Sequence, residues 1–213
     1  MNVVAASTRI ELARIPRRHG WEKVKTGMGE IAGKTLGGFL DRTIPPATVV
    51  STGYCGALAG HVSANDVVIA ESIEDGTGLR PLNDHLVERI ADRLERGGVR
   101  CLRGTVAYRP DVVSSRAGKR ALWVRTHALA VDTESGPLAE AVSGHGGELV
   151  IVRVVLDTAD QDLPFSNTDS PIRSAFRHPV ATQRIARSAG RAAATIGRAV
   201  ALVQEEIEQG VES

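Results

Sequence analysis

The sequence predicts an α/β protein with a single domain. Short runs rich in β-branched residues alternate along the chain with segments of helical periodicity, which is the pattern of an α/β sheet. The length of 213 residues suits one domain and can bury a core without disulfides or a structural metal. No internal repeat, low-complexity tract or linker interrupts the pattern, so we expect one domain over residues 1–213.

The strands are predicted from β-branched runs between turn residues. In chain order they are Val3 to Ala6, Thr48 to Gly53, Asp66 to Ala70, Val99 to Tyr108, Ala121 to Val131 and Glu148 to Leu156. The last of these is apolar on both faces apart from Arg153, as expected of a central strand that is covered on each side.

Three helices follow from periodicity and end signals. Pro81 to Arg96 repeats leucine or isoleucine at four-residue spacing and ends at a glycine pair. A shorter helix is expected from Glu134 to Gly144, and the alanine-rich tail predicts a long helix over roughly 179–209. Asp162 to Pro171 is rich in turn-forming residues and predicts a mobile loop.

Composition excludes several classes of protein. The 26 basic and 25 acidic side chains leave a net charge of +1, which argues against a nucleic-acid or anionic membrane surface. Cys55 and Cys101 lie far apart without zinc-ligand spacing, so no metal site is expected and a reducing cytoplasm is the predicted location. No segment has the length of a membrane span or the pattern of a signal peptide.

Four segments place glycines or carboxylates at the ends of predicted elements, where open α/β sheets bind ligands. They are Ser7 to Glu11, Thr26 to Gly29, Ser51 to Ala57, and the pair formed by Val131 to Ser135 with Arg153 to Asp160.

The carboxylates in these segments have more than one interpretation. Glu11 suits the first turn of a helix. Asp132 and Asp157 can cap helices, or a partly desolvated Asp157 can act as a general acid, and spacing leaves both open. Asp157, Asp160 and Asp162 match no calcium loop, and Cys55 is best interpreted as a small buried side chain.

Taken in order, these segments resemble the purine nucleoside phosphorylase superfamily, which includes methylthioadenosine/S-adenosylhomocysteine nucleosidase and futalosine hydrolase. The resemblance rests on the turn Thr26 to Gly29, the glycine motif Ser51 to Ala57, the strand Asp66 to Ala70, the signature Val131 to Ser135 and the ending Arg153 to Asp157.

The resemblance covers most of the chain, from Val3 to about Pro164, and the run Val154 to Pro164 is most similar to the hopanoid-associated branch. It implies a three-layer α/β/α domain around a mixed, mostly parallel sheet. It also implies cleavage of the N-glycosidic bond of a purine nucleoside or a 5′-modified nucleoside.

The resemblance further implies roles for individual residues. Asp157 matches the aspartate that protonates the departing purine at N7, and Glu11 matches the glutamate that activates the attacking water in the nucleosidases. Glu134 matches the glutamate that holds a ribose hydroxyl, and Gly53 would bring its backbone to the substrate. The expected enzyme needs no metal and no cofactor, apart from inorganic phosphate as co-substrate in a phosphorylase.

Ser7, Thr133, Tyr54 and Val112 complete the predicted substrate-binding set, and three of these positions depart from the family pattern. Thr133 replaces a methionine that packs on the sugar and base. Tyr54 stands where hexameric phosphorylases have a serine, and Ser51 stands where they have an arginine that binds phosphate. The segment around Val112 is aliphatic where the family commonly stacks the base on an aromatic ring.

The absence of the phosphate-binding arginine at Ser51 favours hydrolysis over phosphorolysis. The alternatives are a phosphate-dependent phosphorylase, in which Arg9 or another arginine replaces the missing one, and an inactive nucleoside-binding protein. Family members assemble as dimers, trimers or hexamers, so the expected partners are a small-molecule nucleoside and further copies of the chain. The loop Asp162 to Pro171 is the predicted source of selectivity for the 5′ substituent.

Overall fold

Strands and helices alternate along the computed structural model, which describes residues 1–43, 48–163 and 179–210. The strands are β1 (Asn2–Ala6), β2 (Trp21–Lys25), β3 (Thr48–Ala57), β4 (Val67–Glu74), β5 (Leu79–Pro81), β6 (Cys101–Tyr108), β7 (Ala130–Asp132) and β8 (Glu148–Asp157). The helices are α1 (Arg9–Ala13), α2 (Glu30–Leu40), α3 (Asp84–Arg96), α4 (Arg116–Thr126), α5 (Ser135–Gly144) and α7 (Pro179–Gln209).

All of these strands belong to one mixed sheet. Its order is β2-β1-β3-β7-β6-β4-β5, and β8 pairs with both β3 and β4. The pairs β1·β2, β1·β3, β3·β8, β4·β6 and β6·β7 are parallel, whereas β3·β7, β4·β5 and β4·β8 are antiparallel. Strands β3, β8, β4, β6 and β7 therefore pair in a closed ring, and the predicted sheet curls into a partial barrel.

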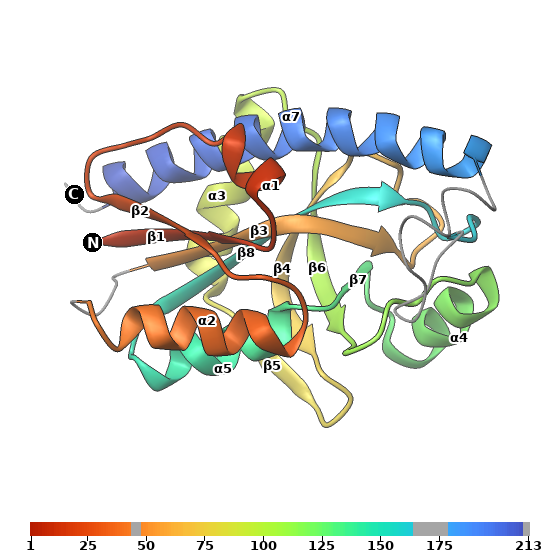
Figure 1. The fold of residues 1–213 in the computed structure, drawn as a ribbon, viewed down its shortest axis with the longest axis horizontal. Coiled ribbons are helices and arrows are strands. Elements are labelled where there is room, and N and C mark those ends of the chain that lie inside the picture. Colours follow the sequence, from red (N-terminus) through yellow and green to blue (C-terminus); the bar gives the residue numbers. More distant parts are fainter. Residues whose placement is uncertain (44–47, 164–178, 211–213) are drawn as a thin grey trace.

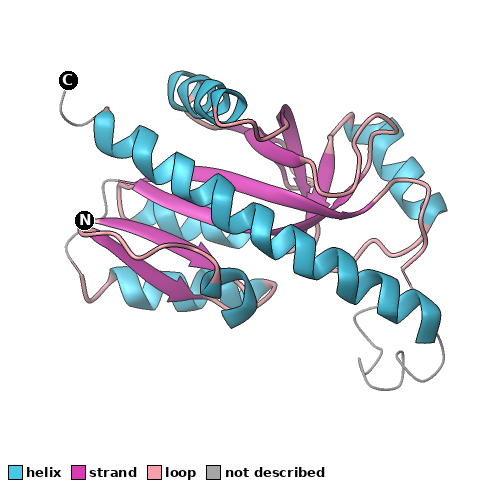
Figure 2. Cartoon of the chain, turned by 90° about the horizontal axis from the view of Figure 1, so that it is seen from above, coloured by secondary structure: helices cyan, strands magenta, loops and turns pink. Residues whose placement is uncertain are grey.

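Helices cover the two faces of the sheet, which confirms the three-layer arrangement. On one face α3 and α7 bury Ile90 and Ile196 against the strands, and α1 lies beside α7 (Figure 1). On the other face α2 and α5 bury Leu36 and Leu138. Seen from above, α7 runs diagonally across its face (Figure 2). Strand β8, predicted as central, is indeed covered on both faces.

The predicted range of α7 agrees with the observed one. Side-chain hydrogen bonds and ion pairs attach its carboxyl-terminal half to the rest of the protein. Arg18 donates to Glu205 at 2.6 Å and to Glu208 at 2.9 Å, and the Trp21 indole donates to Glu208 at 2.8 Å. These residues are partly exposed, so each pair adds little by itself, and the buried apolar face of α7 provides most of the stability.

The predicted strand from Ala121 to Val131 is wrong. Most of it belongs to α4, and only Ala130–Asp132 forms a strand. The helix forms because the Ser115 side chain caps it, accepting from the Gly118 amide at 3.0 Å, and because Lys119 and Leu122 point inward three residues apart. His127 ends it in the left-handed conformation.

Three smaller points concern an unpredicted strand, the start of a helix and a predicted loop. Strand β2 was not predicted, because only Trp21 and Val24 of its five residues are buried and an edge strand can be mostly polar. Helix α3 begins at Asp84, capped by Asn83, because Pro81 ends β5. Of the predicted loop Asp162 to Pro171, residues 164–171 lie outside the described part of the chain.

Candidate active site

A cavity of about 320 Å³ lies where several strands end. The parallel strands β1, β3 and β8 bring their carboxyl ends to one edge of the sheet. Strand β7 runs antiparallel to β3, with Val131 opposite Gly56, and delivers the residues that follow it to the same place. The cavity thus collects the ends of four predicted segments, as expected of an α/β sheet.

Glu11 lies at one end of this cavity and is almost fully buried, at 2% exposure. Its Oε2 accepts hydrogen bonds from the Thr8 amide and the Thr8 hydroxyl, both at 2.7 Å, while the Thr8 hydroxyl accepts from the Glu11 amide. This is a capping box that starts α1. Glu11 is therefore both the first-turn carboxylate that spacing suggests and a cavity residue.

Glu134 and Thr133 line the cavity immediately after β7. The Thr133 hydroxyl donates to Glu134 Oε1 at 2.7 Å. Burial, followed by the nearby Asp132 carboxylate, raises the pKa of Glu134, and Arg153 and the Thr133 hydrogen bond oppose the rise. The Glu11 carboxylate, which lines the same cavity, makes a smaller contribution to the rise.

Asp132 is held by a dense set of donors beneath the cavity. Arg153 Nε donates to its Oδ2 at 2.6 Å, and its Oδ1 accepts from the Ser135 hydroxyl at 2.6 Å and the Ser135 amide at 3.1 Å. These bonds hold the turn that leads into α5, but Glu134 is the N-cap residue of that helix and no side chain caps it, so the helix-cap interpretation of Asp132 is wrong. Arg153 is 1% exposed, donates through Nη2 to Ser51 at 3.0 Å, and has no partner for Nη1 among the described residues.

Asp157 lies at the other end of the cavity, and it caps none of the helices α1 to α5. Its Oδ2 accepts from the fully buried ammonium of Lys119, which comes from α4. Burial raises the pKa of Asp157, and the charge and hydrogen bond of Lys119 oppose the rise. Lys119 was missed by sequence reasoning, because the segment that holds it was interpreted as the approach to a strand.

The two ends of the cavity can be placed along β3. A Cβ atom on Gly53 would lie 2.9 Å from Glu11 Oε1, and one on Gly56 would lie 3.1 Å from Asp157 Oδ2. Gly53 and Gly56 lie three residues apart on β3, so the two carboxylates approach the cavity at different points along this strand. We term these the Glu11 end, which includes Glu134, and the Asp157 end.

The three carboxylates Glu11, Glu134 and Asp157 share one arrangement. Each has one oxygen bound to a neighbouring protein donor and a second oxygen with no hydrogen bond to the described residues. A carboxylate fixed in this way keeps its orientation while its second oxygen stays available to a ligand or a water molecule.

The other predicted substrate-binding residues divide into two groups. Ser7, Tyr54 and Val112 line the cavity, and the Tyr54 hydroxyl is turned to α7, where it donates to the Ala189 carbonyl at 3.2 Å. Gly53 does not line the cavity and instead makes room for the Glu11 carboxylate. Cys55 is buried as predicted, and burial raises the pKa of its thiol.

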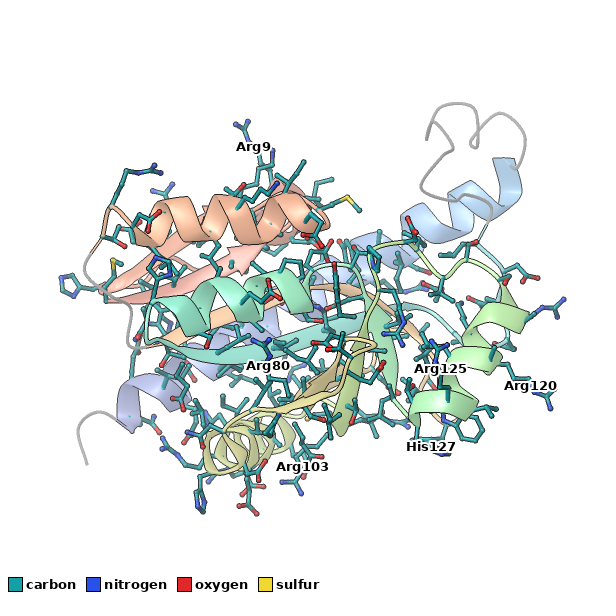
Figure 3. The ribbon with its side chains drawn as sticks, turned by 90° about the horizontal axis from the view of Figure 1, so that it is seen from below. Arg9, Arg80, Arg103, Arg120, Arg125 and His127 are labelled. Carbon is teal, nitrogen blue, oxygen red and sulfur yellow. The ribbon has the colours of Figure 1, made fainter. Side chains whose placement is uncertain are left out.

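The charge of the lining is one-sided. Five carboxylates reach it from different segments: Glu11, Asp111, Asp132, Glu134 and Asp157. No lysine, arginine or histidine of the described residues lines it. Arg9 is exposed on α1 and points outward (Figure 3), and no group of three or more potential metal ligands occurs in the described ranges.

The molecule is an α/β protein with a curled mixed sheet and a cavity at its strand ends, which is where α/β sheets commonly bind small molecules. The chain belongs to the phosphorylase superfamily, whose family model matches residues 24–196. This confirms the predicted superfamily, while the hopanoid-associated branch stays a prediction. No curated protein sequence gives a significant match.

Several solved structures share the fold. Methylthioadenosine/S-adenosylhomocysteine nucleosidase from Helicobacter pylori is 13% identical, with a TM-score of 0.76 over 98% of this chain and 97% of that one. Futalosine hydrolase from the same organism is 14% identical, with a TM-score of 0.77 over 96% and 97%. The Neisseria meningitidis nucleosidase, in complex with methylthio-immucillin-A, is 17% identical, with a TM-score of 0.75 over 96% and 98%.

The long helix α7 packs along the sheet, and none of the helices in the described ranges is long and apolar enough to cross a bilayer.

Proposed function

We propose that this protein hydrolyses the N-glycosidic bond of a purine nucleoside or a 5′-modified nucleoside and releases the base. The observation that carries the proposal is the cavity lining, with five carboxylates and no cationic side chain among the described residues. Cleavage of this bond builds positive charge on the ribose ring, and carboxylates stabilise such charge. The names of the similar structures, two nucleosidases and a futalosine hydrolase, support the same activity.

Glu11 is the base that activates water. Its Oε2 is occupied by Thr8, so the water proton passes to Oε1. The water oxygen forms a bond to the anomeric carbon as the bond from that carbon to the base nitrogen breaks, and the electron pair leaves with the base. Glu134 accepts a hydrogen bond from a ribose hydroxyl through the oxygen that Thr133 leaves unoccupied.

Asp157 is the acid that completes base departure. Its protonated carboxyl donates to N7 of the leaving purine, and the resulting carboxylate keeps its hydrogen bond to Lys119. Burial, by raising the pKa of Asp157, keeps a fraction of this group protonated before reaction. Proton exchange with solvent then restores Glu11 and Asp157 to their starting states. No cofactor enters this scheme.

The charge of the cavity favours water over phosphate as the nucleophile. A phosphate dianion needs cationic or backbone donors, and acidic side chains repel it. Ser51 occupies the position of the phosphorylase arginine, and the nearby Arg153 is bound to Asp132 behind the lining. Phosphate would be a co-substrate only if some residue outside the described ranges supplied the missing charge.

The test is base release from inosine, adenosine and methylthioadenosine, with and without inorganic phosphate. We expect release without phosphate, with free sugar as the second product. Release that requires phosphate and yields a sugar 1-phosphate would replace hydrolysis by phosphorolysis. Binding of these compounds without release of any base would favour the inactive nucleoside-binding protein.

Glu11→Gln tests the role of the base directly. A glutamine can still accept from the Thr8 amide, so the capping box and α1 are preserved. We expect hydrolysis to fall by about 10²-fold or more, because glutamine cannot accept the water proton. Glu22→Gln, which removes an exposed carboxylate on β2, is the matched control and should retain full activity.

A further inference from the structure

Helix α4 carries several cationic side chains, and one of them is buried. Arg116, Arg120 and Arg125 are exposed, and Arg120 points outward from the helix (Figure 3). Lys119, on the same helix, has no exposed surface. Removing an ammonium group from water is strongly unfavourable unless the protein supplies an opposite charge and hydrogen bonds.

The protein supplies both to Lys119. Its Nζ donates to Asp157 Oδ2, to the Thr158 carbonyl at 2.8 Å and to the Gln161 carbonyl at 2.8 Å. An ammonium group has three hydrogens, and all three are used. Asp157 lines the cavity whereas Lys119 does not, so the ammonium holds the carboxyl from behind the cavity wall.

We propose that Lys119 is a positioning residue that orients the Asp157 carboxyl and makes it a stronger acid for base departure. The inference rests on the proposed function and identifies the residue that adjusts the acidity of Asp157. The bonds to the Thr158 and Gln161 carbonyls fix the turn after β8, and the bond to Asp157 transfers this fixed position to the carboxyl.

The charged surroundings make Lys119 the dominant influence on Asp157. The Cys55 thiol faces Asp157 from β3, and its raised pKa keeps it neutral. Asp160 and Asp162, in the turn after β8, interact with Lys119, but both are exposed, and Asp162 is paired with Arg116. Of the charged groups in the described ranges, only Lys119 forms an ion pair with the Asp157 carboxyl.

This placement matters at the moment of proton transfer. When Asp157 gives its proton to the base, a buried carboxylate forms, and burial alone would make that costly. The Lys119 ammonium is already in place to stabilise it, so no reorganisation is needed during the reaction. Without this charge, Asp157 would hold its proton more tightly.

Lys119→Met removes the charge and keeps the volume. Because the acid then binds its proton more tightly, the decline of kcat at high pH should move to higher pH, and the plateau below it should fall by about 10²-fold. Lys119→Arg keeps the charge and should restore part of both properties. Arg120→Met removes an exposed cation from the neighbouring position and should leave the profile unchanged.

A double variant separates an effect through Asp157 from general damage. If Lys119 acts through Asp157, Lys119→Met should reduce kcat no further in a protein that already carries Asp157→Asn. The proposal would be overturned if the losses in the double variant were multiplicative, or if the plateau of kcat fell without a shift of the profile in pH. Lys119 would then have a purely structural role.

A second measurement does not depend on activity. The titration of the Asp157 carboxyl can be followed by carbon NMR with labelled aspartate and assigned by its loss in Asp157→Asn. We expect this titration to move to higher pH in Lys119→Met and to stay near its original position in Arg120→Met. An unmoved titration refutes the role of Lys119, whereas the absence of base release by the unmodified protein refutes only the proposed hydrolysis.

Discussion

The two ends of the cavity hold their carboxylates by different means. At the Glu11 end, the donors come from close neighbours in sequence, since Thr8 holds Glu11 and Thr133 holds Glu134. At the Asp157 end, the donor is Lys119, which lies 38 residues away on α4. The first end is built by hydroxyls and backbone amides, and the second by a buried positive charge.

The difference separates two requirements of one reaction. A group that takes a proton from water, or that accepts a hydrogen bond from a ribose hydroxyl, needs a fixed orientation, and local neutral donors provide it. A buried acid that must release a proton needs a charge nearby to stabilise the carboxylate it becomes. A distant segment of the chain can bring such a charge without exposing it to the cavity.

The largest expected effect comes from removing the acid at the Asp157 end. We expect Asp157→Asn to lower kcat by about 10³-fold, because the amide cannot donate an acidic proton to the base. Substrate affinity should change little, since the carbonyl oxygen of the new amide can still accept from Lys119 and keep the same position. Steady-state measurement of kcat and KM on the best substrate of the panel checks this.

The contrast with Glu11→Gln makes the result specific. Both variants should lose turnover. Only in Asp157→Asn should the size of the loss depend on the basicity of the leaving base, and it should be largest for the poorest leaving group. If kcat and affinity for Asp157→Asn fall by the same factor, Asp157 only positions the substrate and the distinction between the two ends is lost.

The second prediction compares the two buried ion pairs. Arg153→Met should lower the free energy of unfolding by about 3 kcal/mol, because it leaves the Asp132 carboxylate buried without its counter-ion. The donors that remain, the Ser135 hydroxyl at 2.6 Å and the Ser135 amide at 3.1 Å, carry no net charge and do not replace the guanidinium. Lys119→Met should cost less, since burial already favours protonation of Asp157 and the carboxyl can neutralise itself.

Urea unfolding at pH 7 measures both losses. Arg103→Met provides the control, because the pair of Arg103 with Glu71 spans 3.5 Å and both side chains are more than 40% exposed. It should change stability by no more than about 0.5 kcal/mol. Equal losses for Arg153→Met and Lys119→Met would mean that the two pairs serve the same structural purpose.

The same division explains what the sequence could predict. The sheet, α3, α5 and α7 follow from periodicity and end signals that are local in sequence, and so does the capping box of Glu11. The positions of Glu11, Glu134 and Asp157 at one cavity follow from their places at strand ends.

What the sequence could not predict depends on contacts between distant segments. The ring that β8 closes through β3 and β4 leaves no pattern in any one segment. Lys119 sits three residues before Leu122 on the inward side of α4, so a helical interpretation of that segment would have marked it as buried. Its partner would still have been unknown, because nothing in the spacing of residues 119 and 157 indicates contact.

The smallest expected effect is a gain of stability at the Glu11 end. Burial first, and the Asp132 carboxylate second, raise the pKa of Glu134 above its unfolded value. Between these two pKa values the folded protein binds more protons than the unfolded chain, so its stability declines as the pH rises through the folded pKa. Ionised Glu134 is therefore unfavourable for the fold at pH 7.

Glu134→Gln removes this penalty because glutamine is neutral at every pH. The variant should be more stable than the unmodified protein at pH 7, and the gain should shrink as the pH falls towards about 4, where Glu134 becomes protonated in both states. Unfolding curves in urea at a series of pH values between about 4 and 7 give the difference. Glu140→Gln, an exposed change on the same helix, shows the effect of removing a solvated carboxylate. If stability varies with pH in the same way in the unmodified protein and in Glu134→Gln, ionised Glu134 does not destabilise the fold. If the variant is more stable but loses turnover, the ionised carboxylate is needed for binding the ribose at a cost in stability.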